Sequence, residues 1–311
     1  MTDTAREVVL ARPAMSMPTA ANFTVVVRDA VPPEGDGWLK VRPLYLSIDP
    51  YMGARIRGRH MGEPAPAPGD HVVVEAGWTD RAWVRSDSAR KVSTDIAPSL
   101  HLSVLGMPGL TAWAGMTQLA KAGVGDVLTV NAAAGTVGGV AGQIARNLGG
   151  RAVGIAGGPE KCALVTDRYG FDACVDYRRD DWEAQLATAV GDGSTIHFEN
   201  VGAGQLAVGI RLLKLYGRVV LCGLADHYHA DAGPAVTAIG PLVGKRAAVF
   251  GLVVYDFYTR WAEWTALAEP WVKAGRLTIA EDVGGGLDSA GRQIERLMRG
   301  ENLGKTLVKI A

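Results

Sequence analysis

The sequence has few cysteines and no excess of either charge. Its 311 residues include three cysteines, Cys162, Cys174 and Cys222, and they do not show the spacing of metal ligands. So few thiols argue against a disulfide-rich secreted protein and favour a reducing, cytoplasmic compartment. The 32 Lys and Arg residues balance the 32 Asp and Glu residues, so the formal net charge is zero. A balanced chain lacks the basic footprint of nucleic-acid binding, and we expect no nucleic-acid partner.

Long apolar runs are also missing. None approaches the length of a membrane span, so we expect no membrane partner. The first residues, MTDTAREVVLARPA, lack the apolar core of a secretory signal. The chain is nevertheless long enough to bury a large hydrophobic core, and its length predicts two domains.

Short β-like runs dominate from Val8 to about His101. Turn-forming clusters such as VPPEGDG at 31–37 separate them, which predicts a small β-rich lobe. Three prolines between Gly62 and Asp70 exclude a central strand there, because proline cannot donate to a sheet ladder. The predicted strands of this lobe are Phe23–Val27, Trp38–Pro43, His71–Glu75 and Ala82–Val84.

From about Gly109, apolar runs alternate with helical patterns. Strands separated by helices pair in parallel, so this region predicts an α/β fold with a doubly wound sheet. The predicted strands are Val127–Val130, Arg151–Ile155, Ala173–Asp176, Ile196–Glu199, Arg218–Cys222 and Ala247–Val254. The predicted helices are Leu110–Ala122, Gly138–Leu148, Lys161–Tyr169, Trp182–Val190, Gln205–Leu213, Arg260–Lys273 and Ser289–Met298, and an apolar run, Thr306–Ile310, closes the chain.

The stretch from Val127 to Gly158 carries the strongest functional signal. An apolar run enters the small-residue turn AAAGTVGG at 132–139, and a helical pattern and a second apolar run follow. Glycines let a backbone approach a pyrophosphate, and a helix N-terminus offers free N–H groups and a positive dipole end. The alternative is an ordinary turn without a ligand, but four further strand–helix units favour dinucleotide binding.

The end of the second predicted strand bears on the choice of cofactor. An NAD site usually places an acidic residue there to hold the ribose 2′-hydroxyl. Here the tip is small and uncharged, at 155–158, and Lys161 lies just beyond it. Arg178 and Arg179 follow the third strand. These cations favour a 2′-phosphate, hence NADP(H), although the alternative is that they are solvated surface residues.

Several motifs together resemble one protein family. They are LYLSIDPYM at 44–52, GMPGLTAW at 106–113, AAAGTVGGVAGQIA at 132–145, GGPEK at 157–161, FENVG at 198–202 and ENLGK at 301–305. In this order they resemble the medium-chain dehydrogenase/reductase superfamily. Within it, the chain is most similar to the zinc-independent branch of 2-alkenal, leukotriene B4/prostaglandin and curcumin reductases.

The resemblance implies a fold and an assembly. A GroES-like β-barrel lobe at 1–108 and 277–311 would bind the substrate, and a Rossmann domain at 109–276 would bind NADP(H). The active site would lie in the cleft between the two domains and take a small-molecule substrate. In this superfamily the last Rossmann strand often pairs across a dimer axis, so Ala247–Val254 predicts a homodimer.

The resemblance also implies contacts to NADP(H). The turn at 136–139 would meet the pyrophosphate, and Lys161 and Tyr177 would hold the 2′-phosphate. Asn200 and the segment 222–228 would line the bound nucleotide, while 252–254 and Asn302 would border its nicotinamide half. By pattern alone, Tyr177 would be a strand-end aromatic and Asn302 a turn residue. The cofactor-binding residues so expected are Thr111, Gly135, Thr136, Val137, Gly138, Gly139, Gly158, Lys161, Tyr177, Asn200, Cys222, Gly223, Tyr228, Leu252, Val253, Val254 and Asn302.

No zinc site is expected. A catalytic zinc needs a Cys/His ligand set, and the zinc-dependent relatives usually carry a second cluster of four cysteines. The N-terminal lobe contains no cysteine, and His60, His71 and His101 have no carboxylate at ligand spacing.

Hydride transfer to an α,β-unsaturated carbonyl needs a donor near the carbonyl oxygen, because negative charge develops there. Without a metal, a hydroxyl must serve. Tyr51 of the DPYM motif is the first candidate, and the alternative is a packed aromatic. Tyr255 is the second, because it follows the strand expected beside the nicotinamide; it could equally belong to a hydrophobic wall or a subunit contact.

Two departures from the family pattern concern the substrate. The stretch at 238–244 lacks a tyrosine that relatives carry near the substrate carbonyl, and Gly53 replaces an arginine. The segment between Gly62 and His71 is short by about a hairpin, which predicts a trimmed barrel, a more open cleft and a bulky or unusual substrate.

The sequence therefore predicts an NADPH-dependent, zinc-independent oxidoreductase that transfers hydride to an activated C=C bond. Two alternatives stay open at this point. One is a quinone, carbonyl or imine reductase of a specialised biosynthetic pathway, and the other is a non-catalytic NADPH-binding protein.

Overall fold

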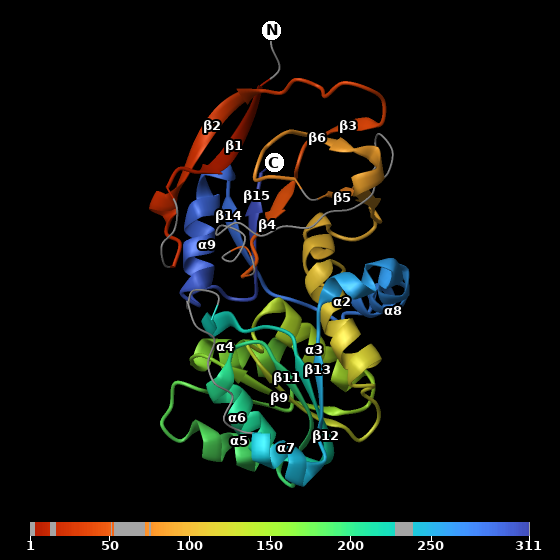
Figure 1. Cartoon of the computed structure of the whole chain (residues 1–311), viewed down its shortest axis with the longest axis vertical. Coiled ribbons are helices and arrows are strands. Elements are labelled where there is room, and N and C mark those ends of the chain that lie inside the picture. Colours follow the sequence, from red (N-terminus) through yellow and green to blue (C-terminus); the bar gives the residue numbers. More distant parts are fainter. Residues whose placement is uncertain are drawn as a thin grey trace. The chain divides into compact units, whose positions relative to one another are not determined.

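A computed structural model describes residues 4–12, 17–50, 52, 72–74, 76–227 and 239–310 (Figure 1). The chain divides into two compact units. The first, here called the split unit, combines Met1–Leu102 with Glu281–Ala311, and the second, the inserted unit, is the continuous segment Ser103–Ala280. The inserted unit thus interrupts the sequence of the split unit. The assignment of substrate binding to a GroES-like lobe stays a prediction.

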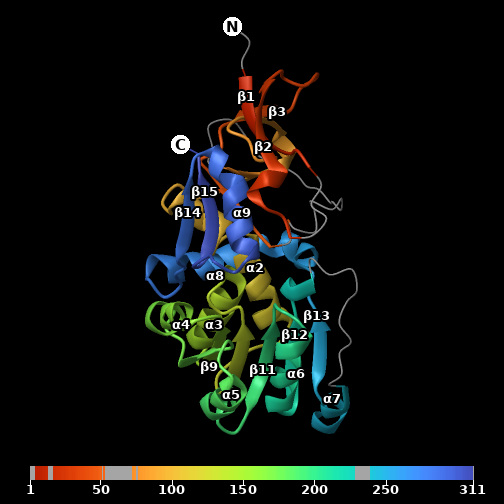
Figure 2. The same ribbon diagram turned by 90° about the vertical axis from the view of Figure 1, so that its left-hand side faces the viewer.

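The inserted unit is built on a six-stranded parallel sheet with the order β10-β9-β8-β11-β12-β13 (Figures 1 and 2). In chain order this is 3-2-1-4-5-6, the order of a doubly wound Rossmann sheet. The α/β prediction is therefore confirmed. The strands are β8 (Val127–Asn131), β9 (Arg151–Ala156), β10 (Ala173–Asp176), β11 (Ser194–Glu199), β12 (Leu213–Leu221) and β13 (Ala248–Gly251).

Helices lie before, between and after the strands of this unit, and those between the strands make the parallel connections. They are α2 (Met107–Trp113), α3 (Thr136–Asn147), α4 (Pro159–Ala163), α5 (Trp182–Val190), α6 (Ala203–Leu212), α7 (Ile239–Lys245) and α8 (Trp261–Lys273). Two helices continue into π-helical turns, Ala114–Leu119 after α2 and Leu164–Arg168 after α4, and 3-10 turns span Ala225–His227 and Val254–Arg260.

The core of the inserted unit lies on both faces of the sheet, because a parallel sheet is buried on both sides. All five residues of β8 are buried. On one face, β9 side chains pack with Leu186 and Val190 of α5. On the other, Phe198 approaches Gly115, where a β-carbon would lie 2.4 Å from the ring. Glycine at 115 therefore allows the helical segment after α2 to approach the sheet.

The split unit consists of short strands in small sheets. β14 pairs in parallel with β15, and β15 pairs antiparallel with β4, while three two-stranded sheets join β1 to β2, β3 to β6 and β5 to β7. Its elements are β1 (Thr4–Leu10), β2 (Phe23–Asp29), β3 (Trp38–Val41), β4 (Tyr45–Ser47), β5 (Val72–Val74), β6 (Ala82–Arg85), β7 (Ala89–Lys91), β14 (Glu281–Gly285), α9 (Ala290–Met298) and β15 (Lys305–Lys309), with 3-10 turns at Ala20–Asn22, Ser86–Ser88, Pro98–Leu102 and Leu287–Ser289.

The core of the split unit joins its two parts of sequence. Leu46 and Ile48 from the N-terminal part cluster with Ile294 of α9 and Val308 of β15. The apolar pattern at 306–310 predicted this strand. In contrast, β14 carries no apolar alternation, and it becomes a strand because β15 offers it a partner. The proline-rich stretch at 62–70, and with it the prediction of a trimmed barrel, lies outside the described residues.

Two predicted boundaries differ from the observed ones for clear reasons. The helix predicted from Leu110 begins at Met107, because Pro108 suits the first helical turn, where no N–H donor is needed. The strand predicted to end at Pro43 ends at Val41, before the proline. None of the helices described here is long and apolar enough to cross a membrane.

Candidate functional site

The ends of β8 and β11 mark the point where the chain changes direction across the sheet. β8 has β9 on one side and β11 on the other, so the helices that follow β8 and β11 leave toward opposite faces. In doubly wound sheets ligands bind outside the carboxyl ends of the strands at this switch point. Most of the residues predicted from the sequence follow the carboxyl ends of strands in this sheet, and those after β8 and β11 are Gly135–Gly139 and Asn200.

The turn after β8 leads directly into α3. Ala132 has a left-handed backbone with φ of 48°, and its carbonyl accepts a hydrogen bond from the Gly135 N–H at 2.9 Å. Gly138 lies so close that a β-carbon would be 2.6 Å from the Ala132 carbonyl oxygen. No side chain of the described residues caps α3, and its first turn holds no acidic residue. The N–H groups of Thr136, Val137 and Gly138 therefore start a helix with a positive, uncapped end.

Gly139 fits under a buried tyrosine. A β-carbon on Gly139 would lie 2.9 Å from the Tyr169 ring. The Tyr169 hydroxyl accepts the Ala280 N–H at 3.1 Å and donates to the Ala134 carbonyl at 3.4 Å. Burial raises the pKa of Tyr169 to about 12. Tyr169 is thus a neutral brace that holds the glycine turn in place.

The turn after β9 is held by Asp176, the last residue of β10. Its Oδ1 accepts the Gly158 N–H at 2.8 Å and the Arg178 N–H at 3.0 Å. Gly158 has φ of 98°, a conformation that glycine adopts without strain. A β-carbon on Gly157 would lie 3.0 Å from the Tyr177 hydroxyl oxygen, so this ring covers the turn.

The cations predicted around this turn differ in their surroundings. Lys161 is half-buried on α4. A guanidinium nitrogen of Arg178 lies within 3.3 Å of a β-carbon placed on Gly158. Arg179 instead forms an ion pair with Asp181 at 3.0 Å. The geometry therefore brings Arg178 to the turn and directs Arg179 elsewhere.

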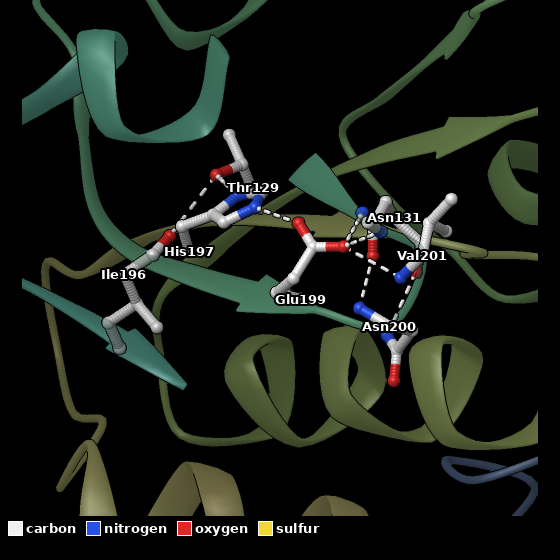
Figure 3. A network of polar contacts seen from close by, with 8 residues as sticks. Thr129, Asn131, Ile196, His197, Glu199, Asn200 and Val201 are labelled. Atoms are coloured by element: carbon white, nitrogen blue, oxygen red, sulfur yellow. Dashed lines mark hydrogen bonds and ion pairs between the residues drawn. The ribbon is translucent and has the colours of Figure 1, made fainter. Parts of the chain in front are cut away.

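Four fully buried polar side chains meet at the ends of β8 and β11, and Figure 3 shows them as a connected network. They are Thr129, Asn131, His197 and Glu199. Glu199 Oε1 accepts three hydrogen bonds, from Asn131 Nδ2 at 2.6 Å and from two backbone N–H groups of the following turn, at 2.6 and 2.7 Å. Its Oε2 lies 2.9 Å from His197 Nε2.

The network also fixes two residues predicted to bind the cofactor. The Asn200 N–H donates to Asn131 Oδ1 at 2.6 Å, and its side-chain amide donates to the Asn131 carbonyl at 3.0 Å. The Glu199 carbonyl accepts the N–H groups of Cys222 at 2.9 Å and Gly223 at 3.1 Å. Asn200, Cys222 and Gly223 therefore lie together at the switch point.

Two titratable groups of this region have displaced pKa values. Burial acts to raise the pKa of Glu199, but the hydrogen bonds from His197, Asn131 and the Val201 N–H outweigh it and hold the pKa below its ordinary value. Burial and the neighbouring Glu199 carboxylate raise the pKa of Cys222 to about 12. Glu199 is thus an ionised carboxylate and Cys222 a neutral thiol at physiological pH.

Residues after β13 continue along the same edge of the sheet. The Leu252 N–H donates to the Leu221 carbonyl at 2.9 Å, and Leu252 is buried while Val253 is 54% exposed. Val254 opens a 3-10 turn. Tyr255 on that turn is half-buried, with its ring edge-on to Tyr258 at 5.2 Å between centroids.

The remaining predicted residues divide into three cases. Thr111 is buried on α2, and its hydroxyl donates to the Met107 carbonyl at 2.7 Å. Asn302 belongs to the split unit, where its amide donates to the Gly304 carbonyl at 2.8 Å. Tyr51 and Tyr228 lie outside the described residues.

The described part of the chain contains no group of three or more His, Cys, Asp or Glu side chains able to hold a metal ion. The His101 ring nitrogen Nε2 lies 2.9 Å from the Ser93 carbonyl oxygen, and the three cysteines are free thiols.

Sequence reasoning missed Asp176, His197 and Glu199. At the end of β11, His197 and Glu199 alternate with the apolar Ile196 and Phe198, and this pattern is a signal that could have revealed the network. Asp176 stands at the end of a predicted strand, where an acidic residue is often only a turn former.

Comparison with known proteins adds the following findings. Residues 136–273 match the family model described as zinc-binding dehydrogenase. The chain is 34% identical to an NADP(+)-dependent 2-alkenal reductase of Nicotiana tabacum, over 90% of this chain and 89% of the relative. It is also 34% identical to an NADPH-dependent curcumin reductase of Escherichia coli, over 98% and 97%. The crystal structure of CurA from Vibrio vulnificus in complex with NADPH superposes with a TM-score of 0.88 at 33% identity, over 98% of this chain and 99% of the other.

Proposed function

This chain belongs to the branch of the medium-chain dehydrogenase/reductase superfamily that contains the 2-alkenal and curcumin reductases, and we propose that it reduces activated carbon–carbon double bonds with NADPH. The observation that carries the proposal is the near full-length similarity to two relatives named for reductions with this cofactor. The geometry of the switch point supports it independently, because it offers the features that a dinucleotide requires.

The glycine turn fits a pyrophosphate. Its helix end is uncapped and free of acidic residues, and Gly138 has no room for a side chain between the turn and the helix. A larger residue there would push the backbone away from a bound phosphate. We assign the pyrophosphate to the N–H groups at 135–139. Asn200, Cys222 and Gly223 at the switch point would line the bound nucleotide, together with Thr111 and, from outside the described residues, Tyr228. The segment 252–254 after β13 and Asn302 would border its nicotinamide half.

The turn after β9 fits a 2′-phosphate better than a free ribose hydroxyl. No acidic side chain stands at the tip of β9, since Ala156, Gly157 and Gly158 occupy it. Asp176 stands at the end of β10, and its Oδ1 accepts backbone N–H groups of this turn. Lys161, Tyr177 and Arg178 would hold the phosphate by charge and hydrogen bonding.

When bound, NADPH would supply the hydride, and the protein's own groups would orient the substrate and stabilise the charge that develops on its carbonyl oxygen. Tyr51 and Tyr255 are the proposed hydroxyl donors. Tyr255 is half-buried beside Tyr258, so the residue is partly accessible from solvent. We propose that no zinc takes part, since the first cysteine of the chain is Cys162, within the Rossmann fold.

We further propose a cytoplasmic homodimer. The three cysteines are free thiols, which suits a reducing compartment. Among the described strands, β13 lies at the edge of its sheet with β12 as its neighbour, and Val249 on it is 43% exposed. An unpaired apolar edge favours pairing with a second copy. A Val249→Lys variant should shift the mass measured by light scattering from dimer to monomer, whereas a monomeric wild type would refute the proposed assembly.

The function is tested by following NADPH consumption against a panel of 2-alkenals, enones, quinones and imines, with identification of the products. Saturated aldehydes or ketones from the enals and enones support the proposal. Hydroquinones or amines as the main products would replace it with quinone or imine reduction. Tight NADPH binding without turnover on any acceptor would indicate a binding protein without catalysis.

A further inference from the structure

The buried network at the switch point has a cost that the fold alone does not require. Thr129, Asn131, His197 and Glu199 are all 0% exposed, within a sheet whose neighbouring positions are apolar. Burying a charged pair costs more than burying apolar side chains of similar size, unless every donor and acceptor is satisfied. A carboxylate and an imidazole at this place therefore call for an explanation beyond packing.

Strand register places these side chains on one face. Thr129 of β8 lies opposite His197 of β11, and alternate residues of a strand point the same way, so Asn131 and Glu199 follow on the same side. The helix α6 covers this face. A β-carbon on Gly209 of α6 would lie 2.5 Å from the His197 ring, so the ring packs directly against the helix backbone.

The carboxylate divides its hydrogen bonds between the turn and the sheet (Figure 3). Oε1 receives the N–H groups of Val201 and Gly202 together with Asn131 Nδ2. Asn131 in turn receives the Asn200 N–H. The N–H groups at 200–202 are therefore drawn inward to Glu199 and Asn131, and this fixes the shape of the turn.

The other carboxylate oxygen defines the tautomer of His197. Because Glu199 is ionised, His197 Nε2 must carry the proton that lies between the two groups. His197 Nδ1 lies 3.0 Å from the Thr129 hydroxyl, which is also 3.3 Å from the Ile196 carbonyl. The imidazole thus donates its hydrogen bond to Glu199 Oε2, so Oε1 can accept the N–H groups of the turn.

We propose that Glu199 is a positioning residue, which holds the turn at 200–202 in the shape that receives the cofactor, with His197 as its partner. The inference rests on the proposed function, because the cofactor is taken to be NADPH. Neither side chain is exposed, so both act through Asn200 and its neighbours rather than by touching a ligand.

The test begins with the Kd of NADPH for the apo wild type, measured by fluorescence titration, and continues with a Glu199→Gln variant. In the variant the amide oxygen takes the place of Oε1, and the amide nitrogen must donate to His197. We expect the Kd and the KM for NADPH to rise about tenfold, because a neutral acceptor holds the three donors less well than a carboxylate. The kcat at saturating NADPH should stay within about twofold.

A spectroscopic readout separates this role from a structural one. In the wild type, ¹⁵N resonances of His197 should show a protonated Nε2, and in Glu199→Gln the proton should move to Nδ1, which then donates to Thr129. A wild-type His197 with an unprotonated Nε2 would overturn the proposal even if the variant did not fold.

Two control variants isolate the effect. Val208→Ala removes core volume beneath the same sheet, so it should lower the melting temperature while the Kd of NADPH stays unchanged. Glu183→Gln removes an exposed carboxylate of the same unit and should change neither. An unchanged Kd and KM in Glu199→Gln would refute the positioning role, whereas a wild type that does not bind NADPH would refute the proposed function instead.

A second variant, His197→Gln, removes the imidazole and keeps one donor to Glu199. Among the described residues, the titratable groups that act on each other here are Glu199, His197 and Cys222. Without the imidazole, burial raises the carboxylate's proton affinity, so NADPH binding should weaken more steeply than in the wild type as the pH falls from about 8 to about 6. The 2′-phosphate itself gains a proton near about pH 6, so the wild type is the reference curve. A variant with the same pH dependence as the wild type would contradict the assigned partnership.

Discussion

Each unit of the chain buries an acid together with a base, but the two pairs do different things. In the split unit, Lys305 is 2% exposed, and its ammonium group donates to Asp49 Oδ1 at 2.5 Å, to Ser47 Oγ at 2.7 Å and to the Ile48 carbonyl at 3.3 Å. In the inserted unit, Glu199 and His197 belong to one strand, and the carboxylate directs its hydrogen bonds to a turn.

The difference lies in what each pair connects. Lys305 uses all three ammonium protons on one short segment, 256 to 258 residues away in sequence, so this pair closes the split unit. Glu199 makes its bonds across adjacent strands and to its own next residues, so that pair shapes a ligand-facing turn. Both pairs are buried, but their partners differ. These partners predict a role in stability for the Lys305–Asp49 pair and a role in binding for the Glu199–His197 pair.

The largest expected effect is the loss of stability when the Lys305–Asp49 pair is broken. Lys305→Met leaves the Asp49 carboxylate buried without its cation, and we expect a loss of about 3–5 kcal/mol in the free energy of unfolding, measured by urea denaturation. Lys309→Met, on the exposed end of the same strand, is the matched control and should change little. Equal losses in the two variants would show that the buried pair adds nothing.

The next largest effect concerns the glycine turn of the inserted unit. Gly138→Ala brings a β-carbon within 2.6 Å of the backbone oxygen of Ala132, which cannot move aside as a flexible side chain could. We expect a loss of about 1–3 kcal/mol in stability and at least a tenfold weaker Kd for NADPH, measured by titration. Gly204→Ala on α6 meets no atom within 4 Å and should leave both values unchanged or slightly improve stability.

A smaller effect is expected on cofactor choice. Arg178→Ala should weaken NADPH about tenfold and leave NADH unaffected, since a guanidinium that holds a 2′-phosphate has no partner on NADH. Arg179→Ala is the control, because that guanidinium is paired with Asp181. Parallel changes for NADPH and NADH would place Arg178 away from the phosphate.

The smallest expected effect is a difference in reactivity between two thiols of the wild-type protein, and its measurement needs no substitution. With a pKa of about 12, Cys222 has about one thiolate in ten thousand molecules at about pH 8, whereas a hydrogen bond with Cys174 lowers the pKa of Cys162 from 9.0. Iodoacetamide should therefore label Cys162 first, and labelling of Cys222 should grow as the pH rises, as read by mass spectrometry. Faster labelling of Cys222 than of Cys162 would contradict the raised pKa that burial and the Glu199 charge give to Cys222.

The sequence predicted what depends on local pattern. The turn from Val127 to Gly139 is contiguous, so its glycines and apolar runs are visible without a structure, and the parallel order follows from alternating elements. The Glu199 network could not be predicted in this way, because Asn131 and Glu199 are 68 residues apart and meet through strand pairing. The strand β14 was missed for the same reason, since its neighbour β15 decides its conformation.

The pairing of β4 with β15 has a consequence for synthesis. Within the described residues, β4 lies at the edge of its three-stranded sheet and finds its neighbour in residues 305–309. During translation the whole inserted unit is synthesised between these two strands. The inserted unit can therefore fold first, while β4 stays without its partner strand β15. The split unit can therefore complete its folding only after residues 305–309 have left the ribosome. Substitutions that weaken the pairing of β4 with β15 would slow the folding of this unit more than they lower the activity of the folded protein.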